Sequence, residues 1–102
     1  MIKTIFYVGL NDKDSLRQEI DSVTAFKMIQ KLVLNYTGGA TLSVARGIYT
    51  MKSGDPVVEE MIRVECDDFA PACVGALVGD IKKTLNQESV LVEYQKIERA
   101  FL

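Results

Sequence analysis

The stretch Ala40–Cys66, ATLSVARGIYT-MKSGDP-VVEEMIRVEC, predicts a β-hairpin around which the rest of the chain can be placed. Apolar and polar residues alternate along both of its halves, which is typical of strands that bury one face. Between the halves, the loop Lys52–Ser53–Gly54 supplies a glycine where a three-residue hairpin loop needs a left-handed backbone. The sequence therefore predicts two long antiparallel strands joined by a tight turn.

The loop also predicts the register of this hairpin. With Met51 opposite Asp55, counting inward brings apolar residues opposite one another, as cross-strand packing favours. The pairs on one face are Leu42–Val64, Val44–Ile62, Arg46–Glu60 and Ile48–Val58, and those on the other are Ser43–Arg63, Ala45–Met61 and Tyr49–Val57. A slip of one residue would exchange the two faces of a strand. We expect the even-numbered side chains to face the helices and the odd-numbered ones to point outward.

The flanking segments complete a β-α-β-β-α-β order. Residues 2–10 and 89–97 are rich in β-branched and aromatic residues and predict strands, whereas 12–20 predicts a loop. Apolar residues at helical spacing predict one helix over about 21–36, ended by Gly38–Gly39, and a second one capped by Asp67 or Asp68. We expect a single domain, 1–102, of the α+β class: a ferredoxin-like sandwich, a four-stranded antiparallel sheet with two helices on one face.

This arrangement predicts which side chains the helices cover and which stay open. The expected covered face carries Phe6, Val8, Leu10, Leu42, Val44, Ile48, Val58, Ile62, Val64, Val90 and Val92. The expected open face carries Ile5, Tyr7, Ser43, Ala45, Tyr49, Met61, Arg63, Glu65, Leu91, Glu93 and Ile97. The second helix has a smooth back with Gly75 and Gly79, which suits either a close approach by a partner or plain exposure.

Composition narrows the function classes. The chain has 102 residues and a net charge of −2 with interspersed signs, which disfavours nucleic-acid binding. Apolar runs are too short to span a membrane, and no leader peptide is expected, so we expect a cytoplasmic protein. Two cysteines predict neither a disulfide framework nor a metal site, and the absence of histidine removes Ser-His-Asp and Cys-His catalysis. No catalytic residue, metal or cofactor is predicted.

Two sets of residues are candidates for binding. The open sheet face predicts an interface, in a homodimer or with another protein, although an ordinary solvated face is the alternative; its residues are Tyr7, Ala45, Tyr49, Met61, Arg63, Leu91 and Glu93. The second set, Asn11, Asp12, Arg46 and Glu60, predicts a site for a small polar or anionic ligand, the alternative being a structural Arg46–Glu60 ion pair. Glu59 and Glu60 point to opposite faces of a strand and are not expected to act together.

Three short motifs carry a resemblance: YVGLND at 7–12, ARGIYT at 45–50 and LNQESVLVEYQKI at 85–97. The chain resembles a group of small uncharacterised bacterial and phage-associated domains of ferredoxin-like fold, and departs from them in the long polar segment 11–20. The resemblance implies an accessory protein of a phage or mobile element. Our leading interpretation is a non-enzymatic module that blocks a host factor or captures a small ligand as a homodimer. The alternative is a cofactor-free enzyme of the dimeric α/β-barrel type that uses Arg46, Glu60, Tyr7 or Tyr49.

Overall fold

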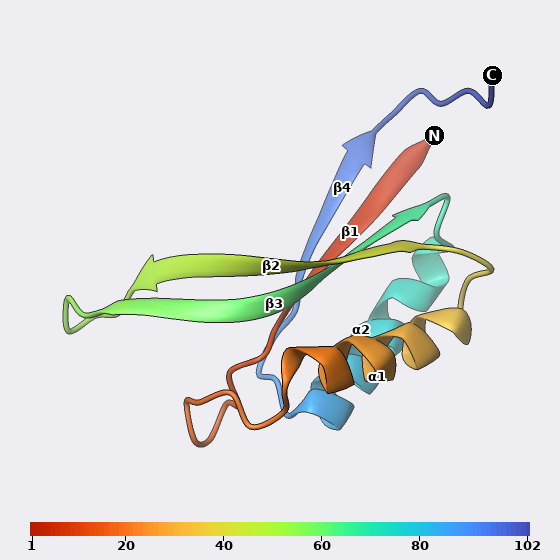
Figure 1. Cartoon of the computed structure of the whole chain (residues 1–102). Helices are drawn as coiled ribbons and strands as arrows, with labels where there is room; N and C mark the ends of the chain where they lie inside the picture. Colours follow the sequence, from red (N-terminus) through yellow and green to blue (C-terminus); the bar gives the residue numbers. More distant parts are fainter.

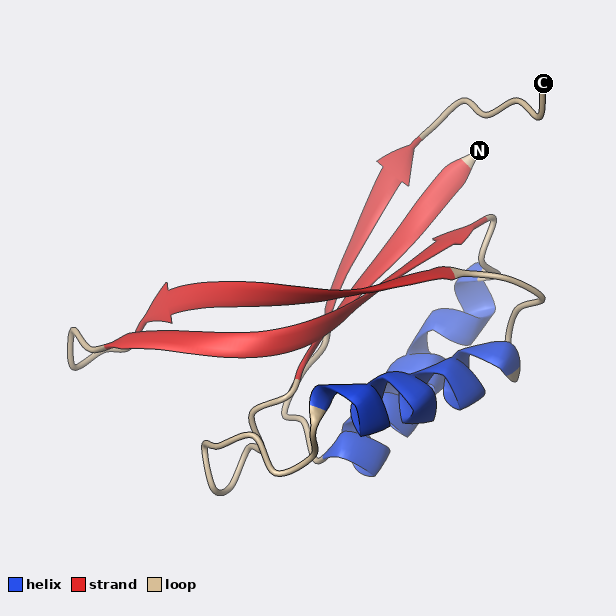
Figure 2. Ribbon diagram, in the orientation of Figure 1, coloured by secondary structure: helices blue, strands red, loops and turns tan.

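The computed structural model describes all 102 residues and contains one four-stranded antiparallel sheet with two helices on one of its faces (Figure 1 and Figure 2). The strands lie in the order β2-β3-β1-β4 across the sheet. The elements are β1 (Ile2–Gly9), α1 (Ser22–Leu34), β2 (Thr41–Thr50), β3 (Pro56–Asp67), the short 3-10 helix η1 (Pro71–Cys73), α2 (Val74–Leu85) and β4 (Leu91–Lys96). The predicted ferredoxin-like α+β class and element order are confirmed.

The β2–β3 hairpin has the predicted register. Val44 lies opposite Ile62, Arg46 opposite Glu60 and Ile48 opposite Val58. Gly54 in the loop has φ +89°, a backbone conformation that a residue with a side chain rarely adopts. The Met51 amide donates to the Asp55 carbonyl oxygen at 2.9 Å and closes the turn.

The core lies between the sheet and the helices, and the predicted helical stripes point into it. Ala25 and Ile29 of α1 and Leu77 and Ile81 of α2 are fully buried, together with Ile62 on β3. Tyr36 joins the two helices because its hydroxyl donates to the Asp80 carboxylate at 2.5 Å, and this bond raises the pKa of Tyr36. Neither helix is both long and apolar enough to cross a membrane.

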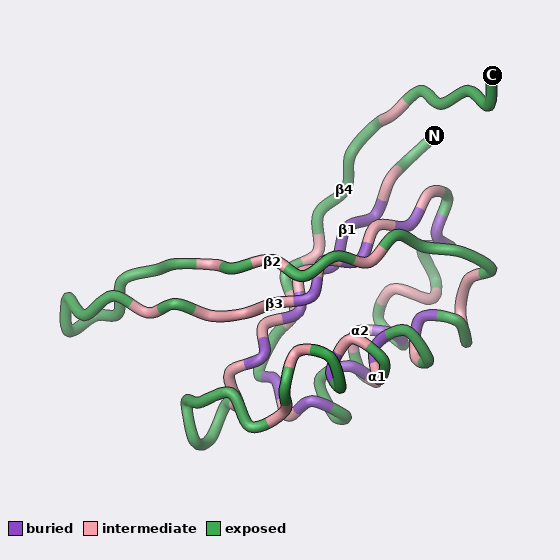
Figure 3. Tube along the Cα trace, viewed as in Figure 1, coloured by how far each residue is buried: buried purple, intermediate pink, exposed green.

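The helices cover only the near half of the hairpin, which corrects the expected burial (Figure 3). On the helix-facing side, Val44, Ile48 and Val58 are 53%, 79% and 56% exposed, although all three were expected to be covered. The physical reason is length, because the 13 residues of α1 span about 20 Å and the 10 residues of β2 span about 33 Å. The distal part of the ribbon, Ala45–Glu60, therefore projects past the helical layer as an arm (Figure 1).

Local signals at the helix ends account for the other differences. Asp21 caps α1 by accepting from the Thr24 amide at 2.9 Å, but the helix ends at Asn35 in a right-handed conformation, before the expected glycines. Neither expected aspartate caps the second helix: Asp67 ends β3 and Asp68 has φ +54°. Pro71 instead starts the 3-10 turn that leads into α2, where its missing amide hydrogen costs nothing.

Candidate functional site

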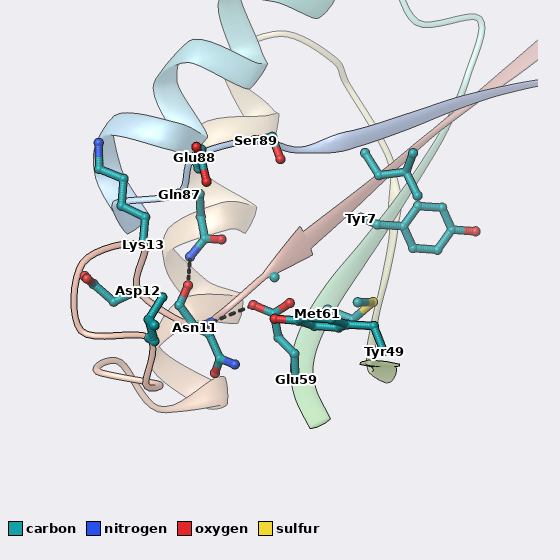
Figure 4. Close-up of a pocket in the computed structure, with 13 residues that line it drawn as sticks. Tyr7, Asn11, Asp12, Lys13, Tyr49, Glu59, Met61, Gln87, Glu88 and Ser89 are labelled. Carbon is teal, nitrogen blue, oxygen red and sulfur yellow. Dashed lines mark hydrogen bonds between the residues drawn. The ribbon is translucent and has the colours of Figure 1, made fainter. Parts of the chain in front are cut away.

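A pocket of about 380 Å³ opens on the sheet face opposite the helices, at the end of the sheet where β1 runs into the loop 11–20 (Figure 4). The strands contribute outward-pointing, odd-numbered residues, and the loop and the α2–β4 connection supply the polar remainder. The volume is in the range of small-molecule sites. The lining residues are Tyr7, Gly9, Asn11, Asp12, Lys13, Leu16, Tyr49, Glu59, Met61, Gln87, Glu88, Ser89 and Leu91.

Glu59 on β3 is held in this pocket by its neighbours. Its Oε2 accepts a hydrogen bond from the backbone amide of Asn11 at 2.9 Å, and the carboxylate lies directly against Gly9 of β1. A Cβ at position 9 would come within 2.5 Å of Glu59 Oε2, closer than atoms can approach. Glycine at position 9 therefore makes room for the carboxylate.

A second glycine makes room for Met61 in the same way. The Met61 methyl carbon lies 2.7 Å from where a Cβ of Gly47 would be, so the thioether side chain lies flat over the Gly47 backbone. Tyr49 of β2 adds to this apolar side, whereas Leu91 lines the pocket from β4, on the other side of β1; both are more than half exposed. The result is an apolar and polarisable wall next to a fixed carboxylate.

Tyr7 borders the pocket from β1 and is fixed by Arg63. The guanidinium carbon of Arg63 lies 5.6 Å from the centre of the Tyr7 ring, and its Nε donates to the Tyr7 hydroxyl at 3.4 Å. Arg63 also forms an ion pair with Glu65, which lies 4.0 Å from Lys3 as well. Because this cation is already paired, the net charge that the pocket presents comes from other residues: three carboxylates, Asp12, Glu59 and Glu88, and one amine, Lys13.

The loop 11–20 is tied to the end of α2. Asn86 Nδ2 donates to Asp12 Oδ2 and to Asp14 Oδ2, both at 2.9 Å, while the Lys13 amide donates to the Asn86 carbonyl at 3.1 Å. The bond from Asn86 is the main cause that lowers the pKa of Asp12, with smaller contributions from the Ser15 and Asp14 amides. Asp12 is therefore an anion at neutral pH, and the loop is held in place beside the pocket.

The structure combines the two candidate sets in one place. Asn11 and Asp12, expected to bind a ligand, line this pocket, and so do Tyr7, Tyr49, Met61 and Leu91, expected to form an interface. Arg46 and Glu60 do not: they form an ion pair at 2.7 Å on the helix-facing side of the arm, with Arg46 exposed. Of the expected interface residues, Ala45, Arg63 and Glu93 lie on the outer side of the sheet but do not line the pocket.

Several features of this region were not predicted from the sequence. Glu59 and Gln87 were not among the expected site residues, although Gly9 and Gly47, where a strand loses its side chain, were a signal that something packs there. Ile5 was expected on the open face and is only 4% exposed, because it lies between Glu65 and Glu93 on the neighbouring strands.

Burial raises the pKa of the Cys66 thiol to about 11, so this residue is an inert part of the core. No three His, Cys, Asp or Glu side chains are grouped as a metal site would require.

Comparison with known proteins gives structural neighbours. No family model matches the chain, and no curated protein matches it. The chain is similar to a phage SAM lyase solved in complex with S-methyl-5′-thioadenosine, with 28% identity, a TM-score of 0.64, and coverage of 93% of this chain and 80% of that one.

Two more distant structures share the fold alone. CutA1 from Oryza sativa is 14% identical with a TM-score of 0.57, covering 99% of this chain and 84% of that one. A DUF3240 family protein from Shewanella baltica OS155 is 9% identical with a TM-score of 0.53, covering 99% and 94%. The phage enzyme and the DUF3240 family protein confirm the resemblance to small phage-associated and uncharacterised bacterial domains that was expected from the sequence.

Proposed function

We propose that this chain binds S-adenosylmethionine in the outer-face pocket and splits it, releasing S-methyl-5′-thioadenosine. The observation that carries this proposal is the fixed Glu59 carboxylate beside an apolar wall of Tyr49 and Met61. A sulfonium ion is a cation with apolar substituents, so it suits a carboxylate next to aromatic and thioether groups. Similarity to a phage SAM lyase bound to the same thioadenosine supports this choice of ligand.

The proposed reaction needs no other reactant. The carboxylate of the methionine part attacks its own Cγ, a C–O bond forms as the C–S bond breaks, and the sulfur keeps the electron pair as a neutral thioether. The products are a lactone and S-methyl-5′-thioadenosine. No protein group exchanges a proton in this step, which fits a chain that contains no histidine.

Glu59 has a binding role in this proposal. The positive charge on sulfur decreases toward the transition state, so a nearby anion stabilises the bound substrate at least as much as the transition state. The apolar wall acts in the opposite sense, because a weakly solvating environment favours a reaction in which charge disappears. Removing the charge of Glu59 should therefore weaken binding and leave turnover at saturation nearly unchanged.

The test is incubation of the protein with S-adenosylmethionine and mass spectrometry of the products. We expect S-methyl-5′-thioadenosine and homoserine lactone in equal amounts. Glu59→Gln should raise KM about tenfold with kcat changed less than about threefold. Glu60→Gln is the matched control, because the adjacent carboxylate is on the other face of β3 and should leave both constants unchanged.

The outcomes separate this function from its alternatives. Loss of kcat in Glu59→Gln, with an unsaturated amino acid as product, would instead indicate that Glu59 removes a proton in an elimination. Tight binding of the thioadenosine without any cleavage would support the non-enzymatic module that captures a small ligand. An absence of both binding and cleavage would overturn the proposal.

We also propose that two copies of the chain associate through the arm. Ile48 and Val58 form an exposed apolar pair on one side of it, and Tyr49 is exposed on the other. Adjacent apolar side chains on an uncovered ribbon favour contact with another protein surface. Light scattering during size-exclusion chromatography should give twice the mass of the chain, and Ile48→Lys should reduce it to that of one chain. Val23→Lys, at an exposed apolar site on α1, should not. A single-chain mass for the unmodified protein at every concentration would rule out association.

A further inference from the structure

Gln87 follows α2 at the edge of the pocket and is one of only two buried polar residues, 7% exposed. Its backbone amide donates to the Lys82 carbonyl at 3.0 Å, which fixes the main chain at this point. Its side-chain Nε2 donates to the Asn11 carbonyl at 2.9 Å and to the Leu85 carbonyl at 3.3 Å. Both hydrogens of the amide are therefore used within the protein.

These two bonds decide the orientation of the amide group. If the group were rotated by half a turn, Oε1 would face two carbonyl oxygens and no donor would be available. Gln87 Oε1 must consequently point away from Asn11 and Leu85. No side chain or amide of the chain donates to it, and Figure 4 shows it directed toward the interior of the pocket. The pocket thus contains a fixed, neutral acceptor that has no partner in the protein.

The same residue, Asn11, anchors this acceptor and the Glu59 carboxylate. The backbone carbonyl oxygen of Asn11 accepts from the Gln87 side chain, and its backbone amide donates to Glu59, both at 2.9 Å. Two hydrogen bonds and one residue of backbone limit the distance between Glu59 Oε2 and Gln87 Nε2 to about 10 Å. One small ligand can therefore reach both groups.

We infer that Gln87 Oε1 accepts a hydrogen bond from the 6-amino group of adenine and thereby selects adenosyl over inosyl ligands. This inference rests on the proposed function, since it assigns the base-recognising group of the same pocket. A neutral amide oxygen suits the neutral amine of the base, while the ammonium and sulfonium groups of the substrate are better matched by carboxylates. An inosyl ligand would present a carbonyl oxygen to Oε1, and two acceptors would then face each other without a proton.

The test compares two neutral ligands by calorimetry, S-methyl-5′-thioadenosine and S-methyl-5′-thioinosine, on the unmodified protein. We expect the adenine compound to bind at least about thirtyfold more tightly, as is usual when a site leaves a polar group unpaired against the wrong ligand. In Gln87→Met, which removes the acceptor at similar volume, the two affinities should come within about threefold of each other. Gln30→Met, the same substitution at an exposed position of α1 outside the pocket, is the control and should keep the preference.

The measured quantity is a ratio, so a general loss of affinity in a variant does not affect the result. If Gln87→Met fails to fold, Gln87→Glu takes its place, because it keeps an acceptor oxygen and should keep the preference for the adenine compound. Equal binding of the two nucleosides to the unmodified protein, or a preference kept in Gln87→Met, would overturn the role of Gln87. Cleavage of S-adenosylmethionine would in that case leave the proposed function intact. If neither nucleoside binds and S-adenosylmethionine is not cleaved, the role of Gln87 and the proposed function are both overturned.

Discussion

The two halves of the β2–β3 ribbon have the same sequence pattern but opposite environments. Near the helices, Ile62 and Val64 are completely buried, whereas Val58, on the same strand and face, is 56% exposed. Alternation determines which face a side chain joins, and it is the length of the covering helices that determines whether this face is buried. The comparison shows that one ribbon serves two purposes: its near half holds the core together, and its far half is an available surface.

The largest expected effect tests this difference directly with one substitution at two places. Val64→Ala should reduce the free energy of unfolding by about 2–3 kcal/mol, because it removes buried methyl groups and leaves a cavity under the helices. Val58→Ala, on the same strand and the same face, should cost less than about 1 kcal/mol when the protein is dilute enough to be a single chain by light scattering. Urea unfolding at that concentration measures both. Similar losses at the two positions in the single chain would contradict the difference between the two halves of the ribbon.

A smaller effect is expected from two glycines, one at the pocket and one on the helical layer. Gly9→Ala places a methyl group against the Glu59 carboxylate, which must move away from the pocket, and the Kd for S-adenosylmethionine should rise about tenfold. Gly75→Ala meets open space on α2, so it should leave Kd unchanged and stabilise the protein by up to about 1 kcal/mol. An unchanged Kd in Gly9→Ala would argue against Glu59 as the group that meets the sulfonium.

The smallest effect concerns the loop 11–20 beside the pocket, which, unlike the arm, is held by hydrogen bonds to the end of the helical layer. Because Asn86 lowers the pKa of Asp12 in the folded protein, the ionised carboxylate stabilises the fold above its ordinary pKa of 3.8. This contribution is lost as the pH falls through the lower, folded value. Asn86→Gly removes the donor and accommodates the left-handed backbone, so it should lower the melting temperature at pH 7 more than at pH 3. Equal differences at both pH values would exclude this contribution.

The fold could be read from the sequence because its signals are local. The alternation of apolar and polar residues predicted the two faces of the ribbon, and Gly54 predicted the turn. Together they predicted the register, including Arg46 opposite Glu60. The bare distal part was also predictable in principle, since the expected helix is shorter than the strand it was expected to cover. The length of the expected helix had not been compared with that of the strand, and periodicity alone does not show where the helix stops covering the sheet.

The site was harder because it is assembled from distant segments. Asn11 and Asp12 were identified from their position after a strand, and Tyr7, Tyr49, Met61 and Leu91 from their outward direction. Nothing in the sequence said that the two groups meet, since that depends on how the loop 11–20 is tied to α2. The importance of Gln87 depends on which carbonyl oxygens surround its amide, and this information exists only in three dimensions. Arg46 and Glu60 were placed correctly on the ribbon, yet they lie on the face away from the pocket.

Under the proposed function, the adenosyl ligand binds on the outer face of the sheet and not on the apolar surface at the helix-facing side of the arm. Methyl resonances in a ¹H–¹³C spectrum distinguish the two surfaces, because both carry suitable reporters. On titration with S-methyl-5′-thioadenosine, the methyl groups of Met61, Leu16 and Leu91 should shift, and those of Ile48 and Val58 should stay in place. Shifts confined to Ile48 and Val58, or no shifts at a saturating concentration, would exclude ligand binding on the outer face.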